Sequence, residues 1–269
     1  LRPVYRAKER GCSLQILDVD EKGRLSLEKL EELFQNGVDI FACTHASNVT
    51  GNLNPLTEIG KLCKKYGVQV GAHPGLPDLQ GFGRRKMTIS PAEAEADVVY
   101  QIGALKAFCD AAGVPLHHVK PHGALYNMAA KDPALAAAIC RAVQAAAPGA
   151  VLLALSGSEM IKAAHTIGLP VASEVFADRG YQPDGTLVPR GTPGAMVEDE
   201  DTAIVRVLQM AKQGTIQAND GSTVTLQADS VCIHGDGPKA LAFVQKISTA
   251  LPAAGVEVRA FTATTSGAT

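Results

Sequence analysis

From residue 67 onward, short apolar runs alternate with longer helical patterns, and this rhythm limits the fold more than any other feature of the chain. Chains in which strands and helices alternate build parallel sheets, because each helix carries the chain back to where the next strand begins. Such a sheet either closes into a β/α barrel or stays open and doubly wound. No Gly-x-Gly-x-x-Gly motif follows the first strand, so we expect the barrel. The expected strands cover residues 68–71, the neighbourhood of residue 119, 151–155, 171–176, 230–233 and 256–261.

Helix start signals and turn residues separate these strands. A capping box begins at Ser90, and Asp132 places an N-cap before a proline at the first helical position. A turn at residues 219–221 predicts a small hairpin within 215–226. The stretch 177–194 is long and rich in glycine and proline, which is typical of functional lids. We expect helices at residues 90–112, 133–147, 158–167, 199–212 and 238–251.

Composition and charge exclude several classes of partner. The chain has 269 residues, 46% of them apolar, and a mean hydropathy of +0.07, as expected for a globular protein with a large core. A net charge of −2 and a pI near 6.4 argue against nucleic acid or a membrane as partner and favour a small-molecule substrate. No apolar run is long enough to span a membrane, and Leu1-Arg2-Pro3 begins no signal peptide. Six scattered cysteines predict free thiols in a reducing cytoplasm.

Titratable side chains stand at or just beyond the carboxyl end of almost every expected strand. In a parallel barrel these ends meet at one rim, so residues far apart in the sequence would share one polar pocket. The alternative is that strand ends are exposed and their loops are polar for that reason alone. The positions are His45, His73, Lys120, His122, Ser156, Glu174, Asp178, His234 and Asp236.

Lys120 and Glu174 have the most constrained surroundings of this set. An apolar residue before Lys120 and a proline after it hold its position. There it either binds a carboxylate or phosphate as a point charge or acts as a base whose pKa is lowered by burial. Glu174 lies in an apolar strand, where an unpaired carboxylate is costly, so we expect it to face a cation or a substrate amide. His122 and His234 are candidates for proton transfer or metal binding.

Three arginines near these strand ends are candidates for binding an anionic group. Arg84, Arg85 and Arg179 carry planar guanidinium groups that hold a carboxylate or phosphate through two hydrogen bonds. The alternative for Arg179 is a surface pair with Asp178. His73 has glycines two residues away on either side, which let a ligand or a metal approach closely; the alternative is a capped turn.

The sequence contains only a weak signal for a metal site. His118 and His122 stand four residues apart, a spacing that aligns two ligands only on a helix, and Pro121 argues against a helix there. The identity of a metal is therefore unknown from the sequence.

Four segments resemble a known family: GAHPGLPDLQGFGRR at residues 71–85, VKPHGALYN at 119–127, EVFADRGY at 174–181 and IHGD at 233–236. In this order they resemble the LamB/YcsF family, the A subunits of 5-oxoprolinase, from about residue 67 to residue 269. The resemblance implies a seven-stranded β/α barrel related to polysaccharide deacetylases. It also implies a hydrolase that opens the cyclic amide of 5-oxo-L-proline (pyroglutamate) to L-glutamate with ATP, together with the partner 5-oxoprolinase subunits B and C.

The resemblance also implies roles for the candidate residues. Lys120 or Arg179 would hold the substrate carboxylate, histidines would transfer protons, and the acids would orient water, nucleotide or metal. ATP is the expected cofactor, and a divalent metal is compatible with this set. The expected catalytic residues are His73, Lys120, His122, Glu174, Asp178 and His234. The expected substrate- or nucleotide-binding residues are Arg84, Arg85, Tyr126, Asn127, Arg179 and Asp236.

The first 66 residues depart from the family pattern. Family members open with an Asp-Leu-Asn-Cys-Asp-Leu-Gly-Glu strand and continue to a Gly-Phe-His-Ala-Gly-Asp motif, and neither is present. Residues 14–67 instead resemble a fragment of a cysteine desulfurase, a class V aminotransferase that depends on pyridoxal phosphate. The fragment lacks the later aspartate and the lysine of such an enzyme, which argues against pyridoxal chemistry. We therefore divide the chain into an atypical segment, 1–66, and a barrel, 67–269.

Loss of the family's first strand would open a hydrogen-bonding edge of the barrel. We expect residues 39–43 to fill that edge, and we expect a strand at 14–17 and helices after Ser26 and Asn54. Two alternative functions remain open at this stage. One is a catalytically inactive binding subunit that lacks the acidic first motif, and the other is a metal-dependent, deacetylase-like hydrolase.

Overall fold

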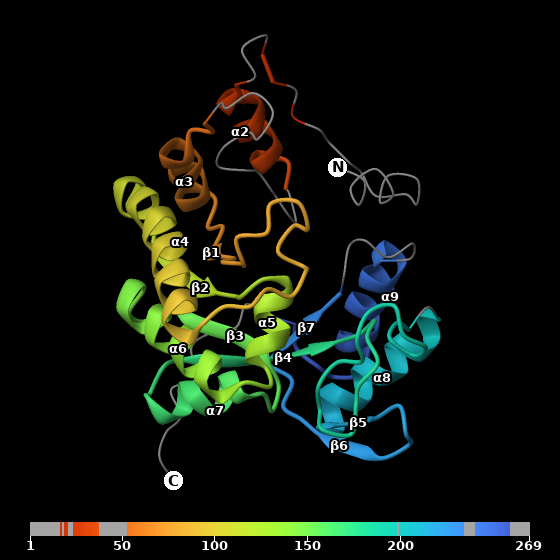
Figure 1. The fold of residues 1–269 in the computed structure, drawn as a ribbon. Coiled ribbons are helices and arrows are strands. Elements are labelled where there is room, and N and C mark those ends of the chain that lie inside the picture. The colour runs from red at the N-terminus through yellow and green to blue at the C-terminus, as the bar shows by residue number, and fades with distance from the viewer. Residues whose placement is uncertain are drawn as a thin grey trace.

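Five parallel strands form a curled sheet at the centre of the molecule (Figure 1). The computed structural model describes residues 17, 19–20, 24–37, 53–197, 199–233 and 240–258, without the side chains of 240–245. Within these residues the strand order is β1-β2-β3-β4-β7, and every neighbouring pair is parallel. The strands are β1 (Val70–Ala72), β2 (Leu116–Val119), β3 (Val151–Leu155), β4 (Val171–Phe176) and β7 (Ser230–Cys232).

The strands follow one another in the sheet in the order in which they occur along the chain. A doubly wound sheet reverses its direction at a switch point, whereas a barrel advances in one direction around its axis. The observed order is therefore that of a β/α barrel-like fold, which confirms the fold class expected from the sequence. It also brings the carboxyl ends of the five strands to one rim.

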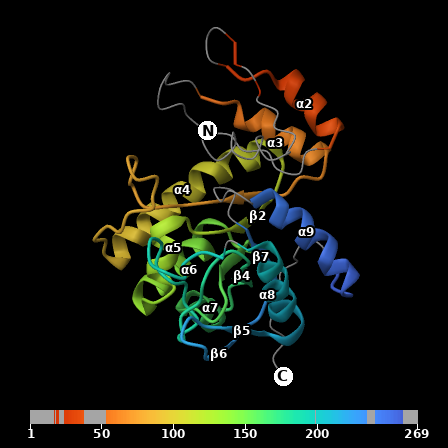
Figure 2. The same ribbon diagram turned by 90° about the vertical axis from the view of Figure 1, so that its right-hand side faces the viewer.

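Helices connect the strands and pack around the sheet (Figures 1 and 2). The predicted capping box is present, since the Ser90 hydroxyl accepts from the Glu93 N–H and the Glu93 carboxylate accepts from the Ser90 N–H. Asp132 caps the next long helix as predicted. These helices are α4 (Pro91–Ala112), α5 (Gly123–Ala129), α6 (Pro133–Ala146), α7 (Glu159–Thr166), α8 (Glu200–Gln213) and α9 (Ala240–Ala253).

Between β4 and β7 the chain makes one long irregular stretch and the predicted hairpin. Strands β5 (Thr215–Gln217) and β6 (Thr223–Thr225) pair antiparallel. The stretch between β4 and the next helix, for which the sequence predicts a lid, is held in place by Arg179, which is 4% exposed. Its Nε donates to the carbonyl oxygen of Ala195 at 3.0 Å and its Nη2 to that of Val188 at 2.6 Å. The Arg179 guanidinium therefore holds two backbone segments of this stretch together.

Two helices of the N-terminal segment are described, and one of them contacts the barrel. Helices α2 (Leu27–Gln35) and α3 (Leu56–Lys65) share a small core of their own. Helix α3 also packs on α4 so closely that a Cβ atom at Gly60 would lie 2.7 Å from the Cβ of Ala112. Both views show this pair of helices at the same end of α4 (Figures 1 and 2). The segment before residue 67 is thus packed against the rest of the chain through α3.

Several sequence expectations have a different outcome. Helix α5 was not expected, because Pro121 precedes it and glycine is its first residue, yet Gly123 starts it with a φ of +54°. Residues 256–258 of the expected last strand are not in a strand, and 259–261 lie outside the described residues. The expected segments 14–16 and 39–43 also lie outside them.

No helix in the described part is long and apolar enough to cross a membrane. The described thiols are free as predicted: Cys63, Cys109, Cys140 and Cys232.

Replacement of Gly123 by alanine tests the backbone that positions helix α5. A Cβ atom there would lie 2.5 Å from the Gly83 carbonyl oxygen, on a residue whose φ is +54°. We expect Gly123→Ala to lower the free energy of unfolding by about 1–3 kcal/mol in urea titrations. The control is Gly103→Ala in helix α4, where a Cβ meets nothing within 4 Å. That change should stabilise by about 0.5–1 kcal/mol, and equal effects of the two changes would contradict this account.

Candidate active site

A buried ion pair joins two strands that are not neighbours in the sheet. Lys120 directly follows β2 and Glu174 lies in β4, with β3 between them. The Lys120 Nζ lies 2.5 Å from the Glu174 Oε1. The Glu174 residue is 1% exposed, so the ammonium group compensates a carboxylate that is almost fully removed from water. The sequence expectation that Glu174 faces a cation is met by Lys120.

Two aromatic rings surround the ion pair. Tyr126, on helix α5, donates its hydroxyl to the Glu174 Oε2 at 2.8 Å, so both carboxylate oxygens are occupied. The Lys120 Nζ lies 6.0 Å from the Tyr126 ring centre and 5.8 Å from that of Phe176, within the range of cation–π attraction. Burial and the nearby Glu174 raise the pKa of Tyr126 well above its usual range. Tyr126 is therefore a hydrogen-bond donor at neutral pH.

Lys120 keeps its positive charge in this setting. Burial by itself lowers the pKa of Lys120, but Cys232 and Glu174 raise it, and the pKa lies above its ordinary value. The Cys232 Sγ lies 3.6 Å from the Lys120 Nζ. Because burial and Glu174 raise the pKa of the Cys232 thiol to about 12, that thiol is neutral at pH 7 and Glu174 is the effective partner. Of the two roles considered for Lys120, the geometry supports the point charge and not the base with a lowered pKa.

A pair of histidines lies beside this centre, held by backbone carbonyl groups. The His73 Nδ1 donates to the Lys120 carbonyl oxygen at 2.6 Å, and the His122 Nε2 donates to that of Phe82 at 2.7 Å. Carbonyl oxygens only accept, so these outer nitrogens carry hydrogen. The inner nitrogens, His73 Nε2 and His122 Nδ1, are 2.9 Å apart and need one further proton to make a hydrogen bond. The two inner nitrogens are therefore placed to share one proton.

The environment of His73 determines its protonation state. Burial lowers the pKa of His73 to about 4, and repulsion from His122, Lys120 and His118 acts in the same direction, against the hydrogen bond to the Lys120 carbonyl. His73 is therefore neutral at pH 7 and carries its hydrogen on Nδ1. Close backbone approach fixes this arrangement, because a Cβ atom at Gly83 would lie 2.9 Å from the His122 Cδ2.

The other predicted site residues divide into those near this centre and those used elsewhere. Asp178 is 4% exposed and its carboxylate contributes to the raised pKa of Cys232, so it lies near the ion pair. Arg85 instead donates from its Nε to the Asp78 Oδ1 at 2.9 Å, and this contact holds the pKa of Asp78 near 2. Asn127 donates to the Gly123 carbonyl oxygen within its own helix. His45, His234 and Asp236 lie outside the described residues.

Three remaining candidates complete this assignment. Arg84 lies over the Phe82 ring, with its Cζ 5.8 Å from the ring centre. Arg179 is used by the loop carbonyls described above. Ser156 lies at the carboxyl end of β3 and lines a separate hollow rather than the ion pair. Within the described residues, no three His, Cys, Asp or Glu side chains gather into a group that could hold a metal ion.

Two residues of the site had no part in the sequence-based assignment. Phe176 follows Glu174 by two positions, and Cys232 is its register partner on the next strand. Side chains two positions apart on a strand point to the same face, so the spacing from Glu174 already predicts that Phe176 lies beside it. The place of Cys232 depends on the register between β4 and β7, which no local sequence pattern specifies.

Comparison with known proteins places this geometry in a family context. A sequence model of the LamB/YcsF family matches residues 36–266. Relatives named as the A subunit of 5-oxoprolinase, from Clostridium beijerinckii and Bacillus subtilis, are each 57% identical over 74% of this chain and cover 78% and 77% of their own lengths. The crystal structure of a lactam utilization protein from Thermus thermophilus is 49% identical, has a TM-score of 0.67, and covers 77% of this chain and 82% of that one. The family match begins within the segment that departs from the family's opening motifs.

Removal of the carboxylate charge tests the ion pair. Glu174→Gln leaves the partly buried Lys120 ammonium without an anion, so we expect a loss of about 2–3 kcal/mol in the free energy of unfolding at pH 7. Urea titration measures it. The control, Asp110→Asn, breaks the exposed pair with Lys106, whose side chain is 36% exposed, and should change stability by less than about 0.5 kcal/mol. A Glu174→Gln effect as small as the control would show that the pair is absent in solution.

The lowered pKa of His73 predicts a pH dependence of stability. Unfolded His73 titrates near its ordinary value of 6.5, whereas the folded residue titrates near 4. Between these values the unfolded state binds more protons, so stability is lost as the pH falls from about 6.5 to about 4. The His73 ring is surrounded by neighbouring groups that lower its pKa, but the residue as a whole keeps an exposed surface, so solvent screening limits the change to about 1 kcal/mol. His73→Gln should flatten this part of a plot of Tm against pH, and an unchanged slope would refute the assignment.

Proposed function

This chain belongs to the LamB/YcsF family, and from that membership we propose that it is the A subunit of a 5-oxoprolinase, a hydrolase that opens a lactam. The substrate would be 5-oxo-L-proline and the product L-glutamate. The observation that carries the proposal is the buried Lys120–Glu174 pair, which stands beside the His73–His122 pair at the carboxyl ends of the strands. Both centres lie where a β/α barrel builds its active site.

The ring-opening reaction needs the groups that this rim presents. Water adds to the lactam carbonyl carbon, the bond from carbon to nitrogen breaks, and the nitrogen takes up a proton to become the amine of glutamate. The charged Lys120 would bind either the substrate carboxylate or the oxygen that becomes negative during attack. His122 would protonate the departing nitrogen, and neutral His73 would take up a proton from the attacking water.

The proposal includes ATP and the partner subunits B and C, as the family resemblance implies. Hydrolysis of ATP would supply the free energy for opening a stable amide. We place the reaction in the cytoplasm, with no nucleic acid or membrane as partner. The comparisons favour neither of the alternative functions, the deacetylase-like hydrolase and the inactive binding subunit.

Lys120→Ala tests the proposal in the complex reconstituted with subunits B and C. We expect ATP-dependent glutamate formation to fall at least about 100-fold, because the charge that binds the substrate or its transition state is gone. Lys106→Ala, which removes an exposed lysine of helix α4, is the control and should keep the normal rate. Circular dichroism and complex assembly are checked for both variants. A folded, assembled Lys120→Ala complex that works at the normal rate would refute the proposed site.

A further inference from the structure

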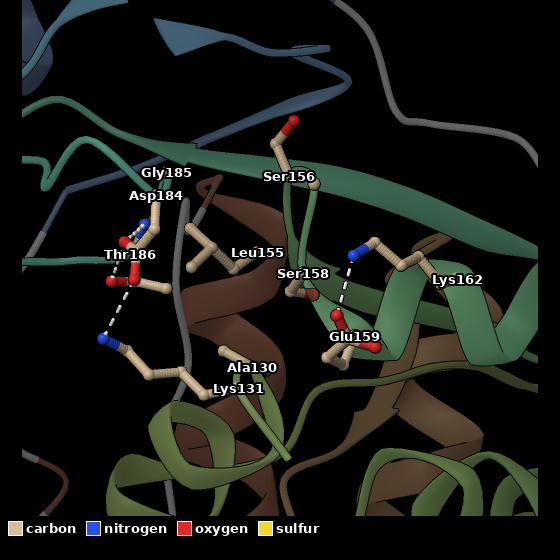
Figure 3. Close-up of a pocket in the computed structure, with 11 residues that line it drawn as sticks. Ala130, Lys131, Leu155, Ser156, Ser158, Glu159, Lys162, Asp184, Gly185 and Thr186 are labelled. Atoms are coloured by element: carbon tan, nitrogen blue, oxygen red, sulfur yellow. Dashed lines mark hydrogen bonds and ion pairs between the residues drawn. The ribbon is translucent and has the colours of Figure 1, made fainter. Parts of the chain in front are cut away.

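A hollow opens at the carboxyl end of β3, where the chain turns into helix α7 (Figure 3). Its volume is about 280 Å³. It lies one strand away from the ion pair, because the Ser156 N–H donates to the Glu174 carbonyl oxygen at 2.9 Å. The residues that matter for its chemistry are Lys131, Ser156, Ser158, Glu159, Lys162 and Asp184.

The start of helix α7 at this hollow has unused hydrogen-bond donors. Ser158 is the N-cap residue, yet its side chain makes no capping hydrogen bond. Its Oγ is buried without a partner in the described part of the structure, although the residue is only 4% exposed. The Met160 and Ile161 N–H groups of the first turn also find no acceptor among the described residues. The Ser158 hydroxyl and these two amides are therefore not used by the protein groups described and can serve a ligand in the hollow.

Ser156 lines the same hollow, but its hydroxyl points away from Ser158 (Figure 3) and accepts a hydrogen bond from the Gln227 N–H at 2.8 Å. Gly157, between the two serines, has a φ of +73° and leaves the turn open, since a Cβ atom there would meet nothing within 4 Å. The loop from β3 to α7 thus gathers hydroxyl and amide donors at the positive end of a helix dipole.

Two lysines approach the hollow from opposite sides (Figure 3). Lys162, on α7, lies 2.7 Å from Glu159, and Lys131, after α5, lies 3.4 Å from Asp184. The lysine side chains are 66% and 50% exposed. Exposed pairs of this kind contribute little stability, so either lysine can leave its carboxylate for a ligand at small cost. The cations, the helix end and the Ser158 hydroxyl all favour an anion over a metal ion.

We propose that the Ser156–Ser158 turn and the start of helix α7 bind a phosphoryl group, with Lys131 and Lys162 closing over it. Several donors around one point suit a phosphate, which offers oxygens in several directions and carries close to two negative charges. The phosphoryl group can belong to free phosphate or to a nucleotide. The inference rests on this hollow alone and does not depend on the proposed ring opening.

Binding of inorganic phosphate to the full chain tests the proposal, measured by calorimetry and by Tm at constant ionic strength against chloride. We expect Ser158→Ala and Lys162→Met each to weaken phosphate binding about fivefold. Glu159→Gln removes a repelling carboxylate and frees Lys162, so it should tighten binding about threefold. Ser158→Ala should leave the Tm without phosphate unchanged or higher, because its hydroxyl makes no hydrogen bond.

The matched control is Ser90→Ala, which removes a capping hydroxyl that is in use. It should lower the Tm and leave phosphate binding unchanged. A parallel titration with ATP distinguishes the sources: competition between ATP and phosphate assigns the hollow to a nucleotide phosphate, and binding of phosphate alone assigns it to a free phosphate. No difference between phosphate and chloride, or unchanged phosphate affinity in both Ser158→Ala and Lys162→Met, would overturn the proposal. Because no turnover is measured, this result is separate from the fate of the proposed reaction.

Discussion

The buried contact between Lys120 and Glu174 is the interaction on which the site depends. A carboxylate in the middle of an apolar strand is tolerated only with a partner, and here the partner comes from beyond the neighbouring strand. Tyr126 occupies the second carboxylate oxygen and so fixes helix α5 against the sheet. One pair of charges therefore links β2, β4 and α5, and any loss of this link frees a charge in a place with little water.

Lys120 also connects the two centres of the site through its backbone. Its ammonium group contacts Glu174, while its carbonyl oxygen accepts from His73. The same residue thus positions a permanent cation and fixes the tautomer of a neutral histidine, whose Nε2 lies 2.9 Å from the His122 Nδ1. A fixed charge and a transferable proton at one rim are what the hydrolysis of an amide requires, since charge develops on oxygen while nitrogen must be protonated.

The local and the long-range features differ in how far the sequence predicts them. Capping residues such as Ser90 and Asp132 start their helices as expected, because each acts on amides within three residues. The meeting of Lys120 with Glu174 was predictable from parallel topology. The partners of Arg85 and Arg179 were not, because they are set by loops that fold back on themselves. Helix α5 was missed for a related reason, since Gly123, its first residue, is typical of a helix breaker until its close contact with the Gly83 carbonyl oxygen is known.

A double-mutant cycle on unfolding free energy tests the central claim most directly. Lys120→Met, Glu174→Gln and the double variant remove each charge alone and then both, while the side-chain volumes stay similar. If the two charges compensate each other in the buried site, the double variant will be more stable than the sum of the single changes implies, by about 2 kcal/mol or more. Additive changes, within about 0.5 kcal/mol, would show that the two residues do not interact and would contradict the account.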